Sequence, residues 1–413
     1  MTNPNPQGAE PILLAFSGGL DTSFCVPWLK DTYGCPVITV TIDTGGIDAA
    51  AARSLETRSR ELGAGQHYLI DARAGYFDQV LKYLIMGNVR RGGVYPLCVG
   101  AERVLQAQTI AQMALKLQTR RVAHGCTAAG NDQVRFEVAL RTLAPNLEII
   151  APVRDRAFKR PEQLKYLEDH KLPIPPFGAA YSVNRGLWGV TIGGKETLTS
   201  AASIPDSAWV LSAEAFSHPR APERHTLTFE AGAPVALDGA RLDAVTLIEK
   251  LEALAGPFGI GRGIHLGDTV IGTKGRVAFE APAAEVIITA HRELEKLVLT
   301  GKQARIKEAV AQPYGDLVHE GQHLDPVCRD IEALLVSSQA RVHGEVQMLF
   351  RPGSLFIEGV TSPFSLMKAS KGVYGEAAGE WTPTDALGYS KMLALTGIFY
   401  QRAGAASSGG EKS

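Results

Sequence analysis

Short apolar runs alternate with stretches of helical periodicity over the first 170 residues of the chain. The apolar runs are rich in β-branched residues, and they predict strands at residues 12–16, 37–42, 66–70, 121–123 and 147–151. The stretches between them predict helices at residues 22–31, 48–62, 71 to about 86, 101–117 and 131–143. This alternation predicts an α/β fold with a parallel, doubly wound sheet that carries helices on both faces.

The pattern changes at the proline-rich stretch 173–178, which predicts a linker. Beyond this stretch, short strand patterns occur at residues 226–230, 235–237, 341–350 and 355–360. They are mixed with helical patterns at residues 243–254, 283–299, 325–337 and 383–400. Strands and helices in this irregular order predict an α+β second domain.

The domain organisation follows from these patterns. We expect a doubly wound domain at residues 11–172, an α+β domain at 173–380 and a C-terminal helical arm at 381–403. The arm begins with Thr382-Pro383-Thr384-Asp385, which is typical of a capped helix start. It serves either self-association or docking on its own domain, and the pattern favours neither. The small and polar residues at 1–10 and 404–413 predict disordered tails.

A glycine-rich loop directly follows the first predicted strand. Its sequence is Ser17-Gly18-Gly19-Leu20-Asp21-Thr22-Ser23, and a helix is predicted to begin within it. Glycines allow the backbone to approach a ligand closely, and a helix N-terminus directs free N–H groups and a positive dipole end at it. The sequence therefore predicts a phosphate site. The loop matches neither of two other common phosphate-binding patterns, G-x-x-x-x-G-K-[ST] and G-x-G-x-x-G. The alternative interpretation is an ordinary strand-to-helix turn.

Composition narrows the choice of partners and compartment. The chain has 413 residues with 45% hydrophobic and 21% charged residues, and its net charge is −1. This balance is typical of a globular protein of two domains, without the basic stripe of a nucleic-acid-binding protein. No apolar run is long enough to span a bilayer, so we expect no membrane partner. The five cysteines include no C-x-x-C pair, which favours a reduced, cytoplasmic compartment.

A second motif extends from His124 to Glu137, where a strand is followed by a loop of small residues and then a helix. Asn131 and Arg135 are four residues apart and share one helix face. The planar guanidinium of Arg135 is suited to a carboxylate, and Thr127, Asn131 and Asp132 could hold an amino-acid head group. The alternative is a capped helix with a solvated arginine.

The stretch His319-Glu320-Gly321-Gln322-His323 fits the zinc-protease pattern H-E-x-x-H, which requires a helix. Pro313 and Gly315 lie just before it, Gly321 lies within it and Pro326 follows it, so we expect no long continuous helix there. No third histidine follows at the spacing of that protease family. We therefore expect no metal site.

The glycine-rich loop resembles that of enzymes that cleave ATP to AMP and pyrophosphate. Together with the second motif and their spacing, it resembles the argininosuccinate synthase family. The resemblance covers most of the chain. It includes Tyr181–Trp188, where Asn184 and Gly186 depart from the family pattern Y-S-x-D-x-N-L-W, and the blocks at 259–262, 271–276 and 279–282. It implies a ligase of arginine biosynthesis, which adenylates the ureido oxygen of citrulline with ATP and then joins the product to aspartate.

The resemblance also implies the residues of each site. The residues implied for ATP are Ala15, Phe16, Ser17, Gly18, Gly19, Leu20, Asp21, Thr22, Ser23, Ile42 and Gly125. The residues implied for aspartate are Thr127, Asn131 and Asp132, and those implied for citrulline are Tyr95, Asn131, Arg135, Ser182 and Thr191. Catalytic roles fall on Ser17, Asp21 and Asp132. Mg²⁺ is expected on the triphosphate, and the family commonly forms homotetramers, for which the helix at 383–400 is the candidate contact.

Three residues depart from the family in the citrulline pocket. Gly100 stands where the family has a serine that contacts citrulline, Gly267 where it has a glutamate and Phe279 where it has a tyrosine. Either Asp268 or Glu280 replaces the lost contacts and free citrulline is the substrate, or the pocket accepts an Nα-acylated citrulline, which has no positive charge to pair. Another ATP pyrophosphatase, amidating or tRNA-thiolating, and a nucleotide sensor without turnover are the remaining alternatives.

Overall fold

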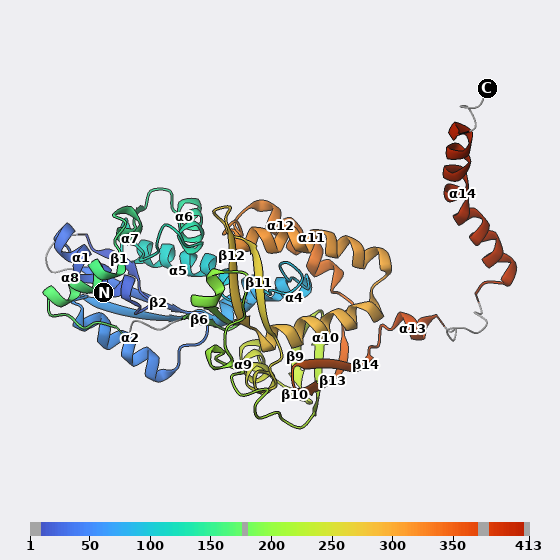
Figure 1. The fold of residues 1–413 in the computed structure, drawn as a ribbon, viewed down its shortest axis with the longest axis horizontal. Coiled ribbons are helices and arrows are strands. Elements are labelled where there is room, and N and C mark those ends of the chain that lie inside the picture. The colour runs from blue at the N-terminus through green and yellow to red at the C-terminus, as the bar shows by residue number, and fades with distance from the viewer. Residues whose placement is uncertain (1–9, 176–180, 371–379, 409–413) are drawn as a thin grey trace. The chain divides into compact units, whose positions relative to one another are not determined.

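The computed structural model describes residues 10–175, 181–370 and 380–408. The chain divides into two compact units, Met1–Pro363 and Phe364–Ser413. The first unit contains all three sheets, and it is drawn from blue to orange in Figure 1. Residues 1–9 of the tail predicted at 1–10 and residues 176–178 of the predicted linker lie outside the described residues.

A five-stranded parallel sheet forms the N-terminal half of the first unit, as the alternating pattern predicted. Its order is β3-β2-β1-β4-β5. The strands are β1 (Ile12–Ala15), β2 (Val37–Asp43), β3 (Gln66–Asp71), β4 (Arg121–Ala123) and β5 (Glu148–Ile150). Because β1 has β2 on one side and β4 on the other, the chain reverses direction across the sheet at β1. The loop after β1 therefore lies at the switch point where such sheets bind ligands.

Helices cover both faces of this sheet. One face packs against α1 (Leu20–Tyr33), α2 (Ala49–Glu61) and α8 (Arg160–Asp169), and the short α7 (Pro152–Asp155) adds Val153 to the same core. The other face packs against α5 (Arg103–Lys116) and α6 (Asp132–Leu143). The doubly wound α/β domain is therefore confirmed, and α1 begins at Leu20, two residues before the predicted start.

The segment between β3 and α5 leaves this domain's core. The helix expected from 71 to about 86 is divided into α3 (Arg73–Tyr76), a π-helical turn η1 (Phe77–Leu81) and α4 (Lys82–Met86). A short 3₁₀ turn, η2 (Gly100–Glu102), precedes α5. Most of the apolar side chains from Tyr76 to Val99 are buried in the core of the second half of the unit, although Val94 is exposed. This packing brings Arg91 and Tyr95 close to residues far along the chain.

Two antiparallel sheets form that second half. One has the order β10-β9-β8-β13-β14 and contains β8 (Glu223–Glu230), β9 (Ala233–Leu237), β10 (Ala240–Arg241), β13 (Gly344–Arg351) and β14 (Ser354–Thr361). The other has the order β11-β12-β7-β6 and contains β6 (Ser182–Gly186), β7 (Gly189–Gly193), β11 (Arg262–Asp268) and β12 (Lys274–Glu280). The sequence patterns did not predict this second sheet.

Helices α9 (Ala244–Ala255), α10 (Pro282–Val298), α11 (Gly301–His319) and α12 (Pro326–Ser338) pack with the sheets, and 3₁₀ turns lie at η3 (Lys195–Leu198), η4 (Asp206–Ala208) and η5 (Gly256–Phe258). The expectation that Pro313 and Gly315 interrupt a helix is wrong, since both lie inside α11. Gly315 lets α11 approach closely, because a Cβ there would lie 2.4 Å from Cγ1 of Val89. The helix ends at His319, before Gly321, whose φ is +81°.

The second unit contains the short helix α13 (Leu366–Ala369) and the long helix α14 (Pro383–Ser408). The start of α14 is capped as predicted: the backbone N–H of Thr382 donates to Oδ2 of Asp385 at 2.9 Å, and the N–H of Asp385 donates to Oγ1 of Thr382 at 3.3 Å. The helix continues to Ser408, so the expectation of a disordered tail is wrong for residues 404–408, and 409–413 lie outside the described residues. In the described part of the chain, no helix combines the length and hydropathy that crossing a membrane requires.

Candidate functional site

The loop after β1 has the geometry of an anion site. Gly18 adopts φ +72°, and a Cβ at this position would lie 2.4 Å from Cδ2 of Leu55. Gly19 is the N-cap of α1. The Ser17 side chain is exposed, and its Oγ lies 3.2 Å from Oγ1 of Thr22. The free N–H groups of the first helical turn and the hydroxyls of Ser17 and Thr22 therefore face one space.

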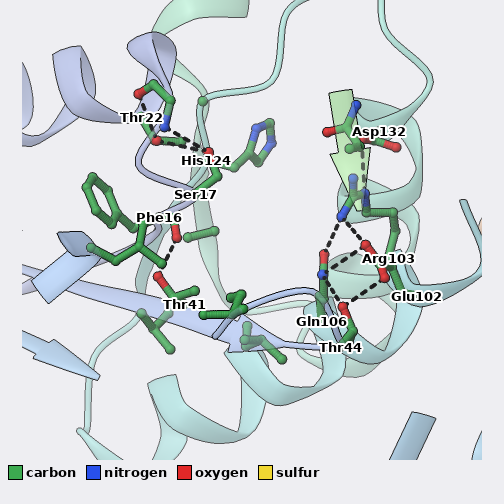
Figure 2. A pocket seen from close by; sticks show the side chains of 18 of the residues that line it. Phe16, Ser17, Thr22, Thr41, Thr44, Glu102, Arg103, Gln106, His124 and Asp132 are labelled. Atoms are coloured by element: carbon green, nitrogen blue, oxygen red, sulfur yellow. Dashed lines mark hydrogen bonds and ion pairs between the residues drawn. The ribbon is translucent and has the colours of Figure 1, made fainter. Parts of the chain in front are cut away.

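That space is a cavity of about 550 Å³ over the carboxyl ends of β1, β2 and β4. Figure 2 shows Ser17, Thr22 and His124 on one side of it and Thr44, Glu102 and Gln106 on the other. Eight of the residues expected for ATP line this cavity: Ala15, Phe16, Ser17, Gly19, Asp21, Thr22, Ile42 and Gly125.

The other three residues expected for ATP do not line the cavity. Gly18 is buried, and its carbonyl accepts a hydrogen bond of 2.6 Å from the Arg58 guanidinium. Leu20 packs against the apolar core beneath the loop, and Ser23 is fully buried on α1. These residues support the loop from behind.

A second cavity of about 490 Å³ adjoins the first. The two share six lining residues: Asp21, Arg103, Gly125, Cys126, Asp132 and Asn184. All the residues expected for aspartate and citrulline line the second cavity: Tyr95, Thr127, Asn131, Asp132, Arg135, Ser182 and Thr191. The residues named from the two sequence motifs thus line two adjoining cavities, and Asp21, Gly125 and Asp132 lie on the wall of both.

Arginines dominate the charge of the second cavity. Arg91, Arg103, Arg135 and Arg276 line it, against Asp21, Asp132 and Asp268. Asp132 accepts hydrogen bonds from Nε of Arg103 at 3.0 Å and from the Arg135 guanidinium at 2.8 Å. Burial opposes ionisation of Asp132, but the two arginines outweigh it and hold its pKa below the usual value. The excess of positive charge suits substrates with several carboxylates.

Arg135 is buried and held in place by α11. Its Nε donates to the His319 carbonyl at 2.7 Å, and its guanidinium lies 3.2 Å from Nδ1 of His319. The Arg91 guanidinium lies 3.0 Å from Nε2 of the same ring. Burial, reinforced by Arg135 and Arg91, lowers the pKa of His319 to about 3, so the ring is neutral and has one acceptor nitrogen. The ring can therefore accept a hydrogen bond from only one of these two arginines. The N–H group of the other arginine that faces the ring remains available to a ligand carboxylate.

Asn131 has a structural role that the sequence did not suggest. Its Oδ1 accepts a hydrogen bond of 2.9 Å from the backbone N–H of Val270, in the turn between β11 and β12. Its amide NH₂ group is then the part that can donate to a ligand.

The three departures from the family pattern have different consequences. A Cβ at Gly100 would lie 3.0 Å from the Arg135 guanidinium, which occupies the adjoining space. Phe279 is buried against Tyr95, with ring centroids 5.2 Å apart. Gly267 lines the second cavity beside His265.

The two carboxylates expected to compensate are both engaged. The expectation for Glu280 is wrong: it is buried, and it accepts hydrogen bonds from the backbone of Val210 and Leu211 and the hydroxyl of Ser212, at 2.5–2.9 Å. Asp268 lines the cavity and forms an ion pair of 2.5 Å with Lys274.

The two histidines of the H-E-x-x-H stretch have separate partners. His319 lies between Arg91 and Arg135, whereas His323 is buried with Nε2 at 3.1 Å from Glu332 and 3.2 Å from the Tyr314 hydroxyl. Among the residues that the structure describes, no group of three or more His, Cys, Asp or Glu side chains could hold a metal ion.

Glu102 is a cavity residue that the sequence analysis missed. Its carboxylate accepts hydrogen bonds of 2.8 Å from Oγ1 of Thr44 and from the Arg103 guanidinium. Gly186, one of the departures from the family pattern, makes room for it, because a Cβ there would lie 2.4 Å from Oε2 of Glu102. Burial raises the pKa of Glu102 to about 7, although Arg103 and Thr44 act in the opposite direction.

We expect Glu102→Gln to stabilise the protein above about pH 7 and to have little effect near pH 5. The folded state favours the protonated carboxyl, so the wild type loses stability as the pH rises through about 7, by on the order of 3 kcal/mol. Glutamine mimics the protonated form and avoids this loss. Thermal unfolding at the two pH values, with Glu345→Gln on the exposed part of β13 as control, measures the effect. Equal destabilisation at both pH values would contradict it.

A parallel α/β domain with a glycine-rich loop at the switch point of its sheet is typical of nucleotide-binding proteins. Two family models match: the N-terminal HUP domain of arginosuccinate synthase over residues 11–173, and its C-terminal domain over 181–400. The chain belongs to the argininosuccinate synthase family, as the sequence motifs predicted. It is therefore a carbon–nitrogen ligase of arginine biosynthesis that uses ATP.

Curated relatives agree over nearly the whole chain. The chain is 40% identical to the argininosuccinate synthase of Xanthomonas campestris over 404 residues, which is 95% of this chain and 98% of that protein. It is 37% identical to that of Pyrobaculum aerophilum over 94% of this chain and 97% of the relative. It is also 37% identical to that of Methanocaldococcus jannaschii over 86% and 89% of the two chains.

Proposed function

We propose that the two joined cavities carry out the two half-reactions of argininosuccinate synthesis. In the first, the ureido oxygen of citrulline attacks the α-phosphate of ATP, and pyrophosphate leaves with the electrons of the broken P–O bond. In the second, the α-amine of aspartate attacks the ureido carbon of citrullyl-AMP, AMP leaves, and the amine loses a proton. The observation that carries this proposal is the shared wall at Asp21, Gly125 and Asp132.

The residues divide between the substrates by chemistry. The hydroxyls of Ser17 and Thr22 and the N-terminus of α1 would bind the outer phosphates. Gly125 lies close to α1, since a Cβ at this position would lie 2.9 Å from Cγ2 of Thr22. Arg135 and the amide of Asn131 would bind the citrulline carboxylate, and Thr127 and Asp132 the aspartate. The protein does little covalent work in this scheme. Catalysis comes from positioning and from the stabilisation of charge.

Mg²⁺ would arrive with the nucleotide. This ion is usually bound through one or two carboxylates together with substrate phosphates. Asp21, in the first turn of α1 and on the wall of both cavities, is the carboxylate that fits this role. The ion would neutralise charge on the phosphates.

The assembly and compartment are part of the same proposal. Helix α14 exposes a series of large apolar side chains: Leu387, Tyr389, Met392, Leu393, Leu395, Phe399 and Tyr400. A series of this kind is typical of a surface that another chain covers, which supports a homotetramer held by this arm. All five cysteines are free thiols, which supports a cytoplasmic location.

Pyrophosphate release tests the activity. We expect sustained release over many turnovers only when ATP, citrulline and aspartate are all present, because without aspartate the citrullyl-AMP is not consumed. We expect a lower kcat/KM for N-acetylcitrulline than for citrulline. Release with ATP and a different amine acceptor would favour another ATP pyrophosphatase, and no release under any condition would favour a nucleotide sensor. A higher kcat/KM for N-acetylcitrulline than for citrulline would favour the acylated substrate. The names of the curated relatives mention no acylated substrate.

Ser17→Ala tests the phosphate loop within this assay. Because Ser17 is exposed and its hydroxyl faces the cavity, we expect the KM for ATP to rise about tenfold and the unfolding temperature to stay unchanged. Ser217→Ala, which removes an exposed hydroxyl on another loop, is the control. Unchanged ATP kinetics in Ser17→Ala would mean that the triphosphate binds elsewhere.

A further inference from the structure

One buried histidine in the second cavity has an unused nitrogen. His265 lies on β11, opposite Val277 of β12, and only 8% of it is exposed. Its ring stacks on Tyr95, with centroids 5.4 Å apart and planes inclined by 15°. Within the described residues, Nε2 of His265 has no hydrogen-bond partner. A buried polar nitrogen of this kind is costly unless a ligand or water satisfies it.

The unused nitrogen lies beside Gly267, which has no side chain. A Cβ at Gly267 would lie 2.6 Å from Nε2 of His265, so the ring edge occupies the space that a side chain at 267 would enter. Both residues line the second cavity together with Tyr95. The absence of a side chain at 267 therefore leaves room for the His265 ring at the wall of the cavity.

The surrounding charges determine what this nitrogen can do. Arg91 is the nearby cation, and His319 of α11 and Tyr95 are the titratable neighbours. Burial and Arg91 lower the pKa of His265, so its ring is neutral at neutral pH and has one acceptor nitrogen. Asp268 is paired with Lys274, and Glu280 faces away. The imidazole is thus the available acceptor at this end of the cavity.

We propose that His265 determines specificity in the citrulline pocket: its Nε2 accepts a hydrogen bond from the α-ammonium group of citrulline. This inference rests on the proposed function, because it assigns the head-group contact of the same substrate. The α-carboxylate, attached to the same carbon, would then lie toward Arg135 and Arg91. A neutral acceptor holds the ammonium without adding another negative charge to the cavity.

The test compares citrulline with 5-ureidopentanoate, which lacks only the α-amino group. In His265→Leu we expect the KM for citrulline to rise about tenfold, the size typical of losing a hydrogen bond to a charged group. The KM values for 5-ureidopentanoate, ATP and aspartate should change less than about threefold. A purely structural role for His265 would raise the KM values of both ureido compounds equally, and that result would overturn the proposal.

Two further variants complete the design. His265→Ala combined with Gly267→Glu should restore citrulline binding, because the smaller side chain makes room for a carboxylate. His225→Leu on β8, a histidine that lines neither cavity, is the control. Wild-type pyrophosphate release that depends on citrulline and aspartate, with no difference between wild type and His265→Leu, would reject this inference alone. Absence of that release in the wild type would reject the proposed function itself.

Discussion

Asp132→Asn is expected to lower kcat for argininosuccinate formation by about 10²–10³-fold, the range seen when one preorganised charge contact is removed from a transition state. The substitution would keep the size of the side chain but lose the charge that Arg103 and Arg135 share. Both guanidiniums would then turn toward other acceptors where the two cavities join. Steady-state pyrophosphate release, with each substrate varied in turn, measures the effect.

The stability of Asp132→Asn should change far less than its activity. About 38% of the Asp132 side chain is exposed, so solvent screens its ion pairs, and we expect a loss of about 1 kcal/mol in unfolding free energy. Asp206→Asn is a matched control, since Asp206 forms an ion pair of 2.9 Å with Arg262 but lines neither cavity. Wild-type kcat in Asp132→Asn would show that Asp132 has no part in the reaction.

Arg135→Ala should raise the KM for citrulline about 100-fold and the KM for ATP less than about threefold. The Arg135 guanidinium lines the second cavity only, so we expect the binding of ATP in the first cavity to be unaffected. Arg135→Lys keeps the charge but loses the planar fork, and it should fall between the wild type and Arg135→Ala. Separate KM values from the same assay distinguish the two ends of the site.

Arg135→Ala should also destabilise the fold, because the side chain is only 6% exposed and ties α6 to the end of α11. We expect a loss of about 3 kcal/mol in unfolding free energy. Arg141→Ala, on the same helix with an exposed side chain paired to Glu137, is the control and should be nearly silent. An equal rise in the KM for ATP and citrulline would indicate collapse of the whole site rather than loss of one contact.

The parts of the site that the sequence predicted are local in the chain. The glycine-rich loop and the motif at 124–137 each sit between a strand and a helix, so their patterns specify both structure and chemistry within a few residues. The parallel sheet brings them together because both follow strands that are neighbours in it, β1 and β4. The loop and the second motif could therefore be assigned to one site from the order of residues alone.

The parts that the sequence did not predict depend on distant residues. The position of Glu102 depends on the space that Gly186 leaves. The position of His265 depends on Gly267, which leaves room for its ring, and on Tyr95, which stacks against it. The strands β6, β7, β11 and β12 are rich in glycine and partly exposed, so they lack the apolar alternation that predicts a strand. Helix α11 tolerates Pro313 and Gly315 because packing against α12, η2 and the segment near Val89 outweighs local propensity.

The two ends of the site belong to different sheets. The proposed nucleotide end lies on loops of the parallel sheet, whereas His265, Gly267 and Thr191 come from the antiparallel sheet of β11, β12 and β7. Because these strands share no backbone ladder with the phosphate loop, mutations in the hairpin can alter which amino acid is recognised while ATP cleavage persists. Substrate preference in this protein can thus evolve separately from its energy source.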